Sequence, residues 1–233
     1  MNNVPTENTD RLNRIDLFRG LTPEQCNQFS ALLRHKVFAA GTTLMTAEQA
    51  GEAVYFILRG TVKVHLEQEN GADVIISILG PGESVGEMSA LDQNHRSASV
   101  VTIEESELLW LDRDAFRRCL LTISAFSYNL ACALSARLRQ ANEQIQSLAT
   151  QDIECRVARQ LLAFAEKYGQ VAEDGSTHIP VRLTQSDLAN LVGATRESIN
   201  KIIVTYKERG HLSANRNYHW TILNRQFLAN RCG

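Results

Sequence analysis

The spacing of apolar residues changes along the chain and separates a strand-rich half from a helical half. Between about residues 37 and 112 the apolar period is two, as Val62 and Val64 show by alternating with polar neighbours. This alternation is typical of half-buried strands, and several short strands with glycines at their turns indicate a β-barrel or β-roll. Asn70 followed by Gly71 predicts a hairpin turn within this region.

A short helical segment is predicted ahead of these strands, over residues 13–35. Thr22 fits the N-cap of a helix, and Pro23 fits its first position, where the missing backbone N–H costs nothing. We interpret this segment as a small element that packs against the strands.

A long helix is predicted after residue 123, because apolar residues recur there every three or four positions. Six of them fall along one narrow stripe, which polar side chains such as Arg137 and Glu143 flank. A narrow stripe is typical of contact between two parallel helices, so we expect it to pair with the same helix of a second subunit. Packing of the helix on the chain's own strands is the alternative. The stripe consists of Leu130, Leu134, Leu138, Ala141, Ile145 and Leu148.

Two short helices joined by a glycine turn are predicted from residue 184 onwards. Thr184 fits an N-cap with Asp187 three residues later, and Gly193 fits the turn. The second helix begins at Thr195 and has isoleucines and Tyr206 on its buried face. This pattern predicts a helix-turn-helix.

The outward face of the second helix carries side chains that can read DNA bases. Arginine binds guanine through two hydrogen bonds, glutamate accepts from cytosine and lysine donates to guanine, each pair discriminating by about 1–3 kcal/mol. The starts of both helices are suited to phosphate contacts, and a hairpin wing with Arg216 at its tip follows. The alternative is a solvated face in which Glu197 and Lys201 form an ion pair. The predicted DNA contacts are Gln185, Ser186, Thr195, Arg196, Glu197, Asn200 and Lys201.

Composition restricts the remaining function classes. The net charge of −2 means that a local basic patch must provide any DNA affinity. The five cysteines have no metal-ligand spacing, which favours a reduced chain without a metal. No apolar run approaches the roughly 20 residues of a spanning helix, so we expect a cytoplasmic protein that does not contact a membrane. The sequence contains no recognisable catalytic arrangement, which predicts that the protein is not an enzyme.

One loop of the strand region has the composition of a sugar-phosphate site. Gly86 and Glu87 are followed, after eight intervening residues, by Arg96, Ser97 and Ala98. A glycine permits close approach of the backbone, a glutamate can accept from a ribose hydroxyl, and an arginine can clamp a phosphate. We refer to residues 86–98 as the cassette.

The cassette, the long helix and the helix-turn-helix, in this order, resemble the cyclic-AMP receptor protein family, also called Crp/Fnr regulators, over roughly residues 13–230. The family cassette reads G-E-x-x-x-L followed by R-S/T-A, and the family recognition helix reads R-E-T/S-V/I-x-R/K. The matching positions are Gly86, Glu87, Leu91, Arg96, Ser97 and Ala98, and then Arg196, Glu197, Ser198, Ile199, Asn200 and Lys201.

The resemblance implies an α+β chain with three parts. Residues 1–122 would form a jelly-roll-like cyclic-nucleotide-binding β-roll with short N-terminal helices, residues 123–150 a dimerisation helix and hinge, and residues 151–233 a winged helix-turn-helix. It further implies a homodimeric transcription activator that binds a palindromic, TGTGA-like DNA site and works with RNA polymerase. The residues themselves leave activation and repression both open.

The resemblance also implies cyclic AMP as the effector, with Glu87 at the ribose 2′-hydroxyl and Arg96 and Ser97 at the phosphate. In the family, two adjacent polar residues of the long helix contact the adenine, and this chain has Ala141 and Asn142 there. Because Ala141 lacks a hydroxyl, cyclic di-GMP, haem or redox sensing, and activity without a ligand remain alternatives. A cyclic-nucleotide-binding module that regulates an enzyme is the alternative from another class. The expected ligand-binding residues are Gly86, Glu87, Met88, Ser89, Arg96, Ser97, Ala98 and Asn142.

Overall fold

The computed structural model of the protein describes residues 11–67, 73–92 and 94–232. The hairpin turn predicted at Asn70 and Gly71 lies outside the described residues.

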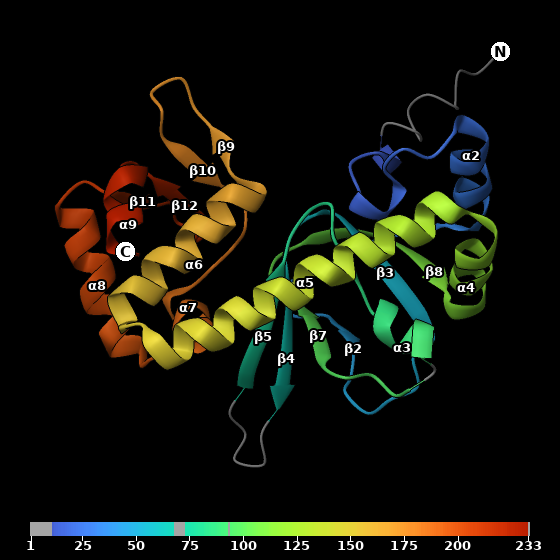
Figure 1. The fold of residues 1–233 in the computed structure, drawn as a ribbon, viewed down its shortest axis with the longest axis horizontal. Coiled ribbons are helices and arrows are strands. Elements are labelled where there is room, and N and C mark those ends of the chain that lie inside the picture. The colour runs from blue at the N-terminus through green and yellow to red at the C-terminus, as the bar shows by residue number, and fades with distance from the viewer. Residues whose placement is uncertain (1–10, 68–72, 93, 233) are drawn as a thin grey trace. The chain divides into compact units, whose positions relative to one another are not determined.

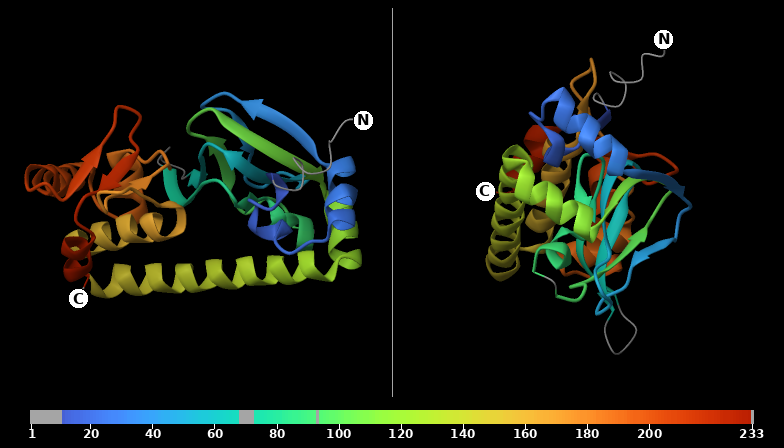
Figure 2. Two further views of the ribbon diagram at one scale, coloured as in Figure 1. Left: turned by 90° about the horizontal axis from the view of Figure 1, so that it is seen from above. Right: turned by 90° about the vertical axis from the view of Figure 1, so that its right-hand side faces the viewer.

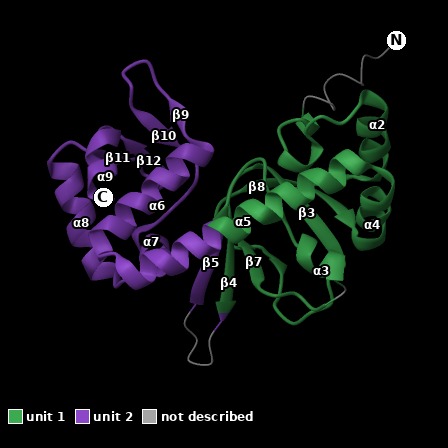
Figure 3. Ribbon diagram, in the orientation of Figure 1, with its two compact units in different colours: residues 1–66, 78–139 green, residues 67–77, 140–233 purple. Residues whose placement is uncertain are grey.

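The chain divides into two compact units (Figure 3). The first unit comprises residues 1–66 and 78–139, and the second comprises residues 67–77 and 140–233. In the described part of the chain no single helix is long and apolar enough to cross a membrane, although the pair α4 (Arg113–Thr122) and α5 (Ser124–Thr150), bent by 109°, passes on length and composition alone.

Residues 34–112 form two four-stranded sheets (Figure 1), which confirms the predicted β-roll. The strand order is β1-β8-β3-β6 in one sheet and β2-β7-β4-β5 in the other. β1 and β8 are antiparallel, and their register runs from Arg34 opposite Trp110 to Phe38 opposite Ser106. The strands are β1 (Arg34–Phe38), β2 (Thr43–Met45), β3 (Ala53–Arg59), β4 (Val62–Glu67), β5 (Asp73–Leu79), β6 (Ser84–Val85), β7 (Ser99–Thr102) and β8 (Ser106–Asp112).

Alternation along β3 explains why this strand contributes to two cores. Successive side chains of a strand point to opposite faces of the sheet. Val54 and Phe56 therefore join a cluster beneath the helices, whereas Ile57 joins a second cluster that also contains Met45 of β2 and Val100 of β7. The second cluster lies between the two sheets.

Helices cover the first of these cores. Figures 1 and 2 show α2, α4 and the first turns of α5 side by side. Four phenylalanines bring them together: the ring centroids of Phe18 and Phe29 lie 4.7 Å apart, those of Phe29 and Phe126 4.7 Å, and those of Phe116 and Phe126 5.6 Å. The helices are the 3-10 turn η1 (Asp16–Phe18), α2 (Pro23–Leu32), α4 (Arg113–Thr122) and α5 (Ser124–Thr150).

The predicted start of α2 is confirmed. Thr22 is the N-cap and Pro23 is the first helical residue. The Thr22 side chain accepts a hydrogen bond from the Gln25 backbone N–H, and the Gln25 side chain accepts one from the Thr22 backbone N–H. This reciprocal arrangement satisfies two backbone donors that the first helical turn leaves free.

The long helix α5 does not present the predicted stripe as one exposed surface. Leu130 is only 3% exposed and belongs to the core of its own unit, and Leu134 packs against the same core. Leu138 and Ile145 are 64% and 66% exposed. The expectation that Leu130 contributes to a contact between subunits is therefore wrong, because a side chain already buried in its own core has little surface left for a partner.

The second unit contains the predicted helix-turn-helix. Its helices are covered by a small sheet of strand order β11-β12-β10-β9. The buried Trp220 of β12 donates from Nε1 to the Leu183 carbonyl oxygen at 2.6 Å, which attaches the sheet to the segment before the helix-turn-helix. The elements are α6 (Ile153–Tyr168), β9 (Gln170–Val171), β10 (Thr177–Ile179), α7 (Gln185–Val192), α8 (Arg196–Glu208), β11 (Leu212–Ala214), β12 (Trp220–Ile222) and α9 (Arg225–Arg231).

Candidate functional sites

The cassette begins at a position that requires glycine. Gly86 follows β6 and has a φ of +91°, a backbone conformation that other residues rarely adopt. A Cβ at this position would lie 2.5 Å from the Met45 Cε and 2.6 Å from the Arg96 Nη1. The short helix α3 (Glu87–Asp92), which the sequence did not predict, follows directly. Glycine therefore brings the backbone close to the arginine of the same cassette.

Arg96 is buried inside the cassette. It donates from Nη1 to the Gly86 carbonyl oxygen and to the Ser89 Oγ, both at 2.8 Å, and from Nη2 to the Ala53 carbonyl oxygen. Burial lowers the pKa of the Arg96 guanidinium, an effect that Tyr55 and Glu87 oppose. All three hydrogen-bond acceptors are neutral, so this buried cation stands to gain from an anionic ligand.

Glu87 is buried at the start of α3 and pairs with a cation from α5. Its Oε1 accepts a hydrogen bond from Arg137 Nη1, and Arg137 Nη2 donates to the Ser84 carbonyl oxygen. The Glu87 Oε2 is also buried and has no hydrogen-bond partner among the described residues. A buried carboxylate oxygen without a donor is costly, so it favours the approach of a ligand hydroxyl.

The other predicted ligand-binding residues differ in their exposure to solvent. Ser89 is buried and bonded to Arg96, Met88 and Ser97 are exposed, and Ala98 is half-buried. Asn142 is exposed on the last part of α5, which belongs to the second unit.

Arg137 was expected from the sequence only as a polar flank of the stripe and not as a residue of the cassette site. A signal for it existed, because Arg137 follows Leu130 by two helical turns and therefore lies on the same face of α5. Once Leu130 is known to face the β-roll, Arg137 is expected to reach the β-roll as well.

A cavity of about 440 Å³ adjoins Arg96 in the β-roll. Arg34, Tyr55 and Trp110 line it together with Arg96, and the Arg34 guanidinium lies 4.7 Å from the centroid of the Trp110 ring. A volume of this size is in the range of small-molecule sites.

The helix-turn-helix is fixed by strong local signals. Thr184 and Asp187 form a capping box at the start of α7, which confirms the predicted N-cap. Gly193 ends α7 in the left-handed conformation, with φ of 61°. Thr195 caps α8 by accepting from the Ser198 backbone N–H at 3.2 Å. These caps begin both helices and end α7 at the predicted positions.

The outward face of α8 is open to solvent. Arg196, Glu197, Asn200 and Lys201 are exposed, while Ile203 on the opposite face is buried. Lys201 Nζ lies 2.9 Å from Glu197 Oε1, and both side chains are well exposed. Such a pair contributes only about 0.3–0.5 kcal/mol, so it does not prevent either side chain from contacting a base.

The first residues of the two helices are accessible as well. Ser186 in α7 and Thr195 before α8 are exposed, and Gln185 is half-buried. Arg216 is exposed between β11 and β12, the two strands of the wing.

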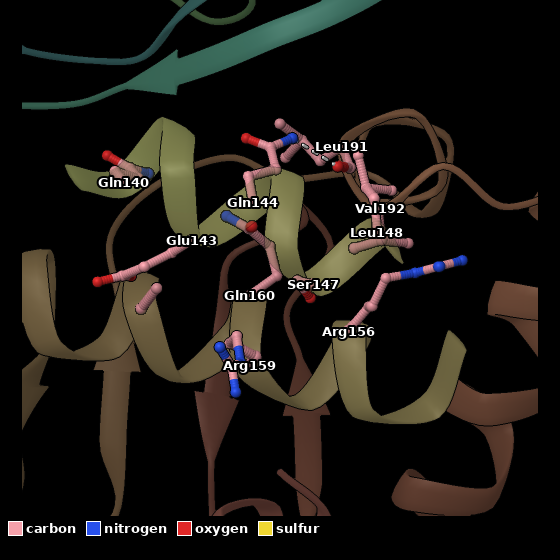
Figure 4. A pocket seen from close by; sticks show the side chains of 11 residues that line it. Gln140, Glu143, Gln144, Ser147, Leu148, Arg156, Arg159, Gln160, Leu191 and Val192 are labelled. Atoms are coloured by element: carbon pink, nitrogen blue, oxygen red, sulfur yellow. Dashed lines mark hydrogen bonds between the residues drawn. The ribbon is translucent and has the colours of Figure 1, made fainter. Parts of the chain in front are cut away.

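The end of α5 packs on the helix-turn-helix within the second unit (Figure 4). Gln144 donates from Nε2 to the Leu191 carbonyl oxygen at 3.0 Å. A Cβ on Gly193 would lie 3.0 Å from the Leu148 Cδ2, so Leu148, predicted in the subunit contact, faces the turn of its own helix-turn-helix. A cavity of about 60 Å³ lies between α5, α6 and α7. The last turns of α5 therefore contact the helix-turn-helix directly.

Within the described residues no group of three His, Cys, Asp or Glu side chains is arranged to hold a metal ion.

Comparison with known proteins agrees with these two sites. A cyclic nucleotide-binding domain model matches residues 35–122, and a Crp-like helix-turn-helix domain model matches residues 155–231. The chain is 33% identical over 199 residues to the CRP-like cAMP-activated global transcriptional regulator of Mycobacterium tuberculosis, covering 85% of this chain and 88% of that protein. It is 30% identical to the cyclic AMP receptor protein of Thermus thermophilus, covering 83% and 86%.

A solved structure shares the fold. The c-di-GMP responsive global regulator CLP of Xanthomonas campestris has a TM-score of 0.69 at 21% identity, covering 86% of this chain and 99% of that chain. The two sites and these matches define a DNA-binding transcription regulator with a cyclic nucleotide-binding domain, and its relatives are regulators rather than enzymes. The chain belongs to the Crp/Fnr family of transcription regulators.

Proposed function

We propose that the protein is a cytoplasmic homodimer that binds a palindromic, TGTGA-like operator and works with RNA polymerase when cyclic AMP occupies the cassette. The observation that carries the effector assignment is the buried Oε2 of Glu87, which has no hydrogen-bond partner among the described residues, near the buried cation of Arg96. A ribose hydroxyl would satisfy the first, and a cyclic phosphate would neutralise the second. A cyclic ribonucleotide carries both groups on one small molecule.

We further propose that the cassette passes the effect of nucleotide binding on to α5. Arg137 donates to Glu87 and to the Ser84 carbonyl oxygen. A nucleotide that hydrogen-bonds Glu87 and places a phosphate nearby would redistribute these contacts and so act on α5. A ligand changes an equilibrium only through such a difference in contacts between two states.

The exposed face of α5 supports the homodimer. Leu138 and Ile145 are seven residues apart, and Tyr128, which is 70% exposed, lies ten residues before Leu138. These spacings place the three side chains on one stripe of the helix. We therefore assign the subunit contact to this stripe, in which Tyr128 replaces Leu130.

Calorimetry of the purified protein against cyclic AMP, cyclic GMP and cyclic di-GMP tests the effector. Cyclic AMP is expected to bind, and Glu87→Gln is expected to weaken its binding by about 1–3 kcal/mol, since the ribose hydroxyl would lose a charged acceptor. Glu105→Gln makes the same change on the exposed surface and is expected to leave binding unchanged. Equal affinity of the Glu87→Gln variant and the unaltered protein for cyclic AMP would contradict the assignment.

Cyclic di-GMP is the second candidate effector. Ala141 supplies no hydroxyl to an adenine, and the structurally similar CLP is described as c-di-GMP responsive. Heat of binding with cyclic di-GMP and none with cyclic AMP in the same titrations would select this alternative.

A further inference from the structure

The second unit holds two cysteines that the proposed function does not use. Cys155 is buried in the first turn of α6, and Cys232 is the half-buried C-cap of α9. The Cys232 Sγ lies 3.9 Å from the Cys155 carbonyl oxygen and 3.4 Å from the Leu228 carbonyl oxygen. The thiol of Cys232 therefore lies against the backbone of Cys155. Neither cysteine is part of a disulfide. The fold brings the two close together although they are distant in the sequence.

The surrounding structure holds these two thiols in place. Glu154 and Arg231, the residues directly before the two cysteines, form an ion pair with 3.4 Å between Oε1 and Nε. Phe227 of α9 packs edge-on against Tyr206 of α8, with ring centroids 5.3 Å apart. The packing of α6, α8 and α9 therefore brings the two cysteines together.

We propose that Cys155 and Cys232 form a reversible disulfide that ties α9 to the beginning of α6. The oxidant is a low-molecular-weight disulfide. The more accessible Cys232 thiolate attacks one of its sulfurs, forms a mixed disulfide and releases one small thiolate. The Cys155 thiolate then attacks the Cys232 sulfur, which forms the protein disulfide and releases the second small thiolate. Two protein thiols are oxidised, one small disulfide is reduced, and the two protons end on the two small thiols.

The protonation state of Cys232 determines how fast this exchange runs. Burial raises the pKa of the Cys232 thiol, and the neighbouring Cys155 adds to this effect, while Arg159 opposes it. The thiol is therefore protonated at neutral pH, and the thiolate that attacks becomes more abundant as the pH rises. The rate is expected to increase about tenfold per pH unit as long as the pH stays below the raised pKa.

The disulfide would enclose the helix-turn-helix in a closed loop from residue 155 to residue 232. A cross-link that closes a long loop stabilises a fold by restricting the unfolded chain. We therefore expect oxidation to raise the midpoint of thermal unfolding by several degrees and reduction to reverse the change.

Peptide mapping of the full chain tests the proposal without DNA or nucleotide. The reduced protein is incubated with oxidised glutathione at pH 7 and pH 8, blocked with N-ethylmaleimide and digested with trypsin without reduction. The expected product joins the peptide of residues 140–156 to the peptide that begins at Cys232. It should form about ten times faster at pH 8 than at pH 7.

Single variants control for other cysteines. Cys155→Ser and Cys232→Ser should each abolish the product, while Cys132→Ser, which alters an exposed cysteine on α5, should retain it. The proposal is overturned if Cys232 of the unaltered protein remains a mixed disulfide with glutathione, or if neither Cys155 nor Cys232 is modified.

Discussion

Glu87 and Arg96 are both buried in the cassette, yet their hydrogen-bonding requirements are met differently. The three donations of Arg96 go to neutral oxygens of the chain, whereas Glu87 keeps one oxygen without a partner in the described structure. Leaving such a group unpaired costs about 1–3 kcal/mol, which native structures usually accept where a ligand supplies the missing bond. The residue-level account of the effector site depends on this difference.

Arg196 is the residue for which we predict the clearest effect on DNA sequence selection. Arg196→Ala should lose about 1–3 kcal/mol of operator affinity and relax selection at one guanine, because arginine binds guanine through two hydrogen bonds. Fluorescence anisotropy on single-base variants of the operator measures this loss.

Gln185→Ala is the matched comparison, since Gln185 is expected to contact phosphate at the start of α7. It should weaken binding to all sequences alike. Equal losses on every operator for Arg196→Ala would refute base reading by this side chain.

Sequence reasoning succeeded for residues whose role is local and failed for those whose role depends on a distant partner. Gly86, Thr184 and Gly193 were predictable because turn geometry and helix capping restrict residue type at the position itself. Arg137 was missed because its partner Glu87 is 50 positions away along the chain. Leu130 was misplaced for the same reason, since periodicity does not tell which side of a helix faces the chain's own core.

At the level of elements, α5 has two faces with separate tasks. Leu130, Leu134 and Arg137 face the first unit, whereas Leu138 and Ile145 are exposed. An exposed apolar stripe on a helix is energetically unfavourable in water and is expected to be covered by a partner.

We predict that the double variant with Leu138→Asp and Ile145→Asp is monomeric. Two carboxylates facing their copies on a parallel helix repel each other and lose the apolar contact. Sedimentation velocity should show the variant at half the mass of the unaltered protein. Val171→Asp, which alters a 76% exposed valine of β9, should leave the dimer intact. A double variant that sediments like the unaltered protein would exclude this stripe as the subunit contact.

Element length decided which helices were predictable. The 13 residues of α8 and the 16 of α6 contain several helical turns, so their periodicity is readable. The six residues of α3 and the seven of α9 make hardly two helical turns. Over so few residues a strand or a loop explains the order of apolar and polar residues equally well. The β-roll was predictable as a class, whereas the strand order within its sheets follows from contacts that no local pattern encodes.

At the level of the whole molecule, one helix carries contacts of both functions. Arg137 of α5 pairs with Glu87 in the cassette, and Gln144, seven residues later, donates to the Leu191 carbonyl oxygen in α7. We propose that a change at the first contact would act on the helix that also contacts α7. Because one helix makes both contacts, we propose that nucleotide binding and DNA binding are coupled through it. Such coupling acts in both directions, so each ligand changes the affinity for the other by the same factor.

Operator affinity measured with and without cyclic AMP at one fixed salt concentration tests the central claim most directly. Saturating cyclic AMP is expected to tighten binding of the unaltered protein to a TGTGA palindrome by about tenfold or more, and to have no such effect on the Glu87→Gln variant. An affinity of the unaltered protein that stays the same with and without cyclic AMP would contradict the claim that occupancy of the cassette by this nucleotide controls DNA binding.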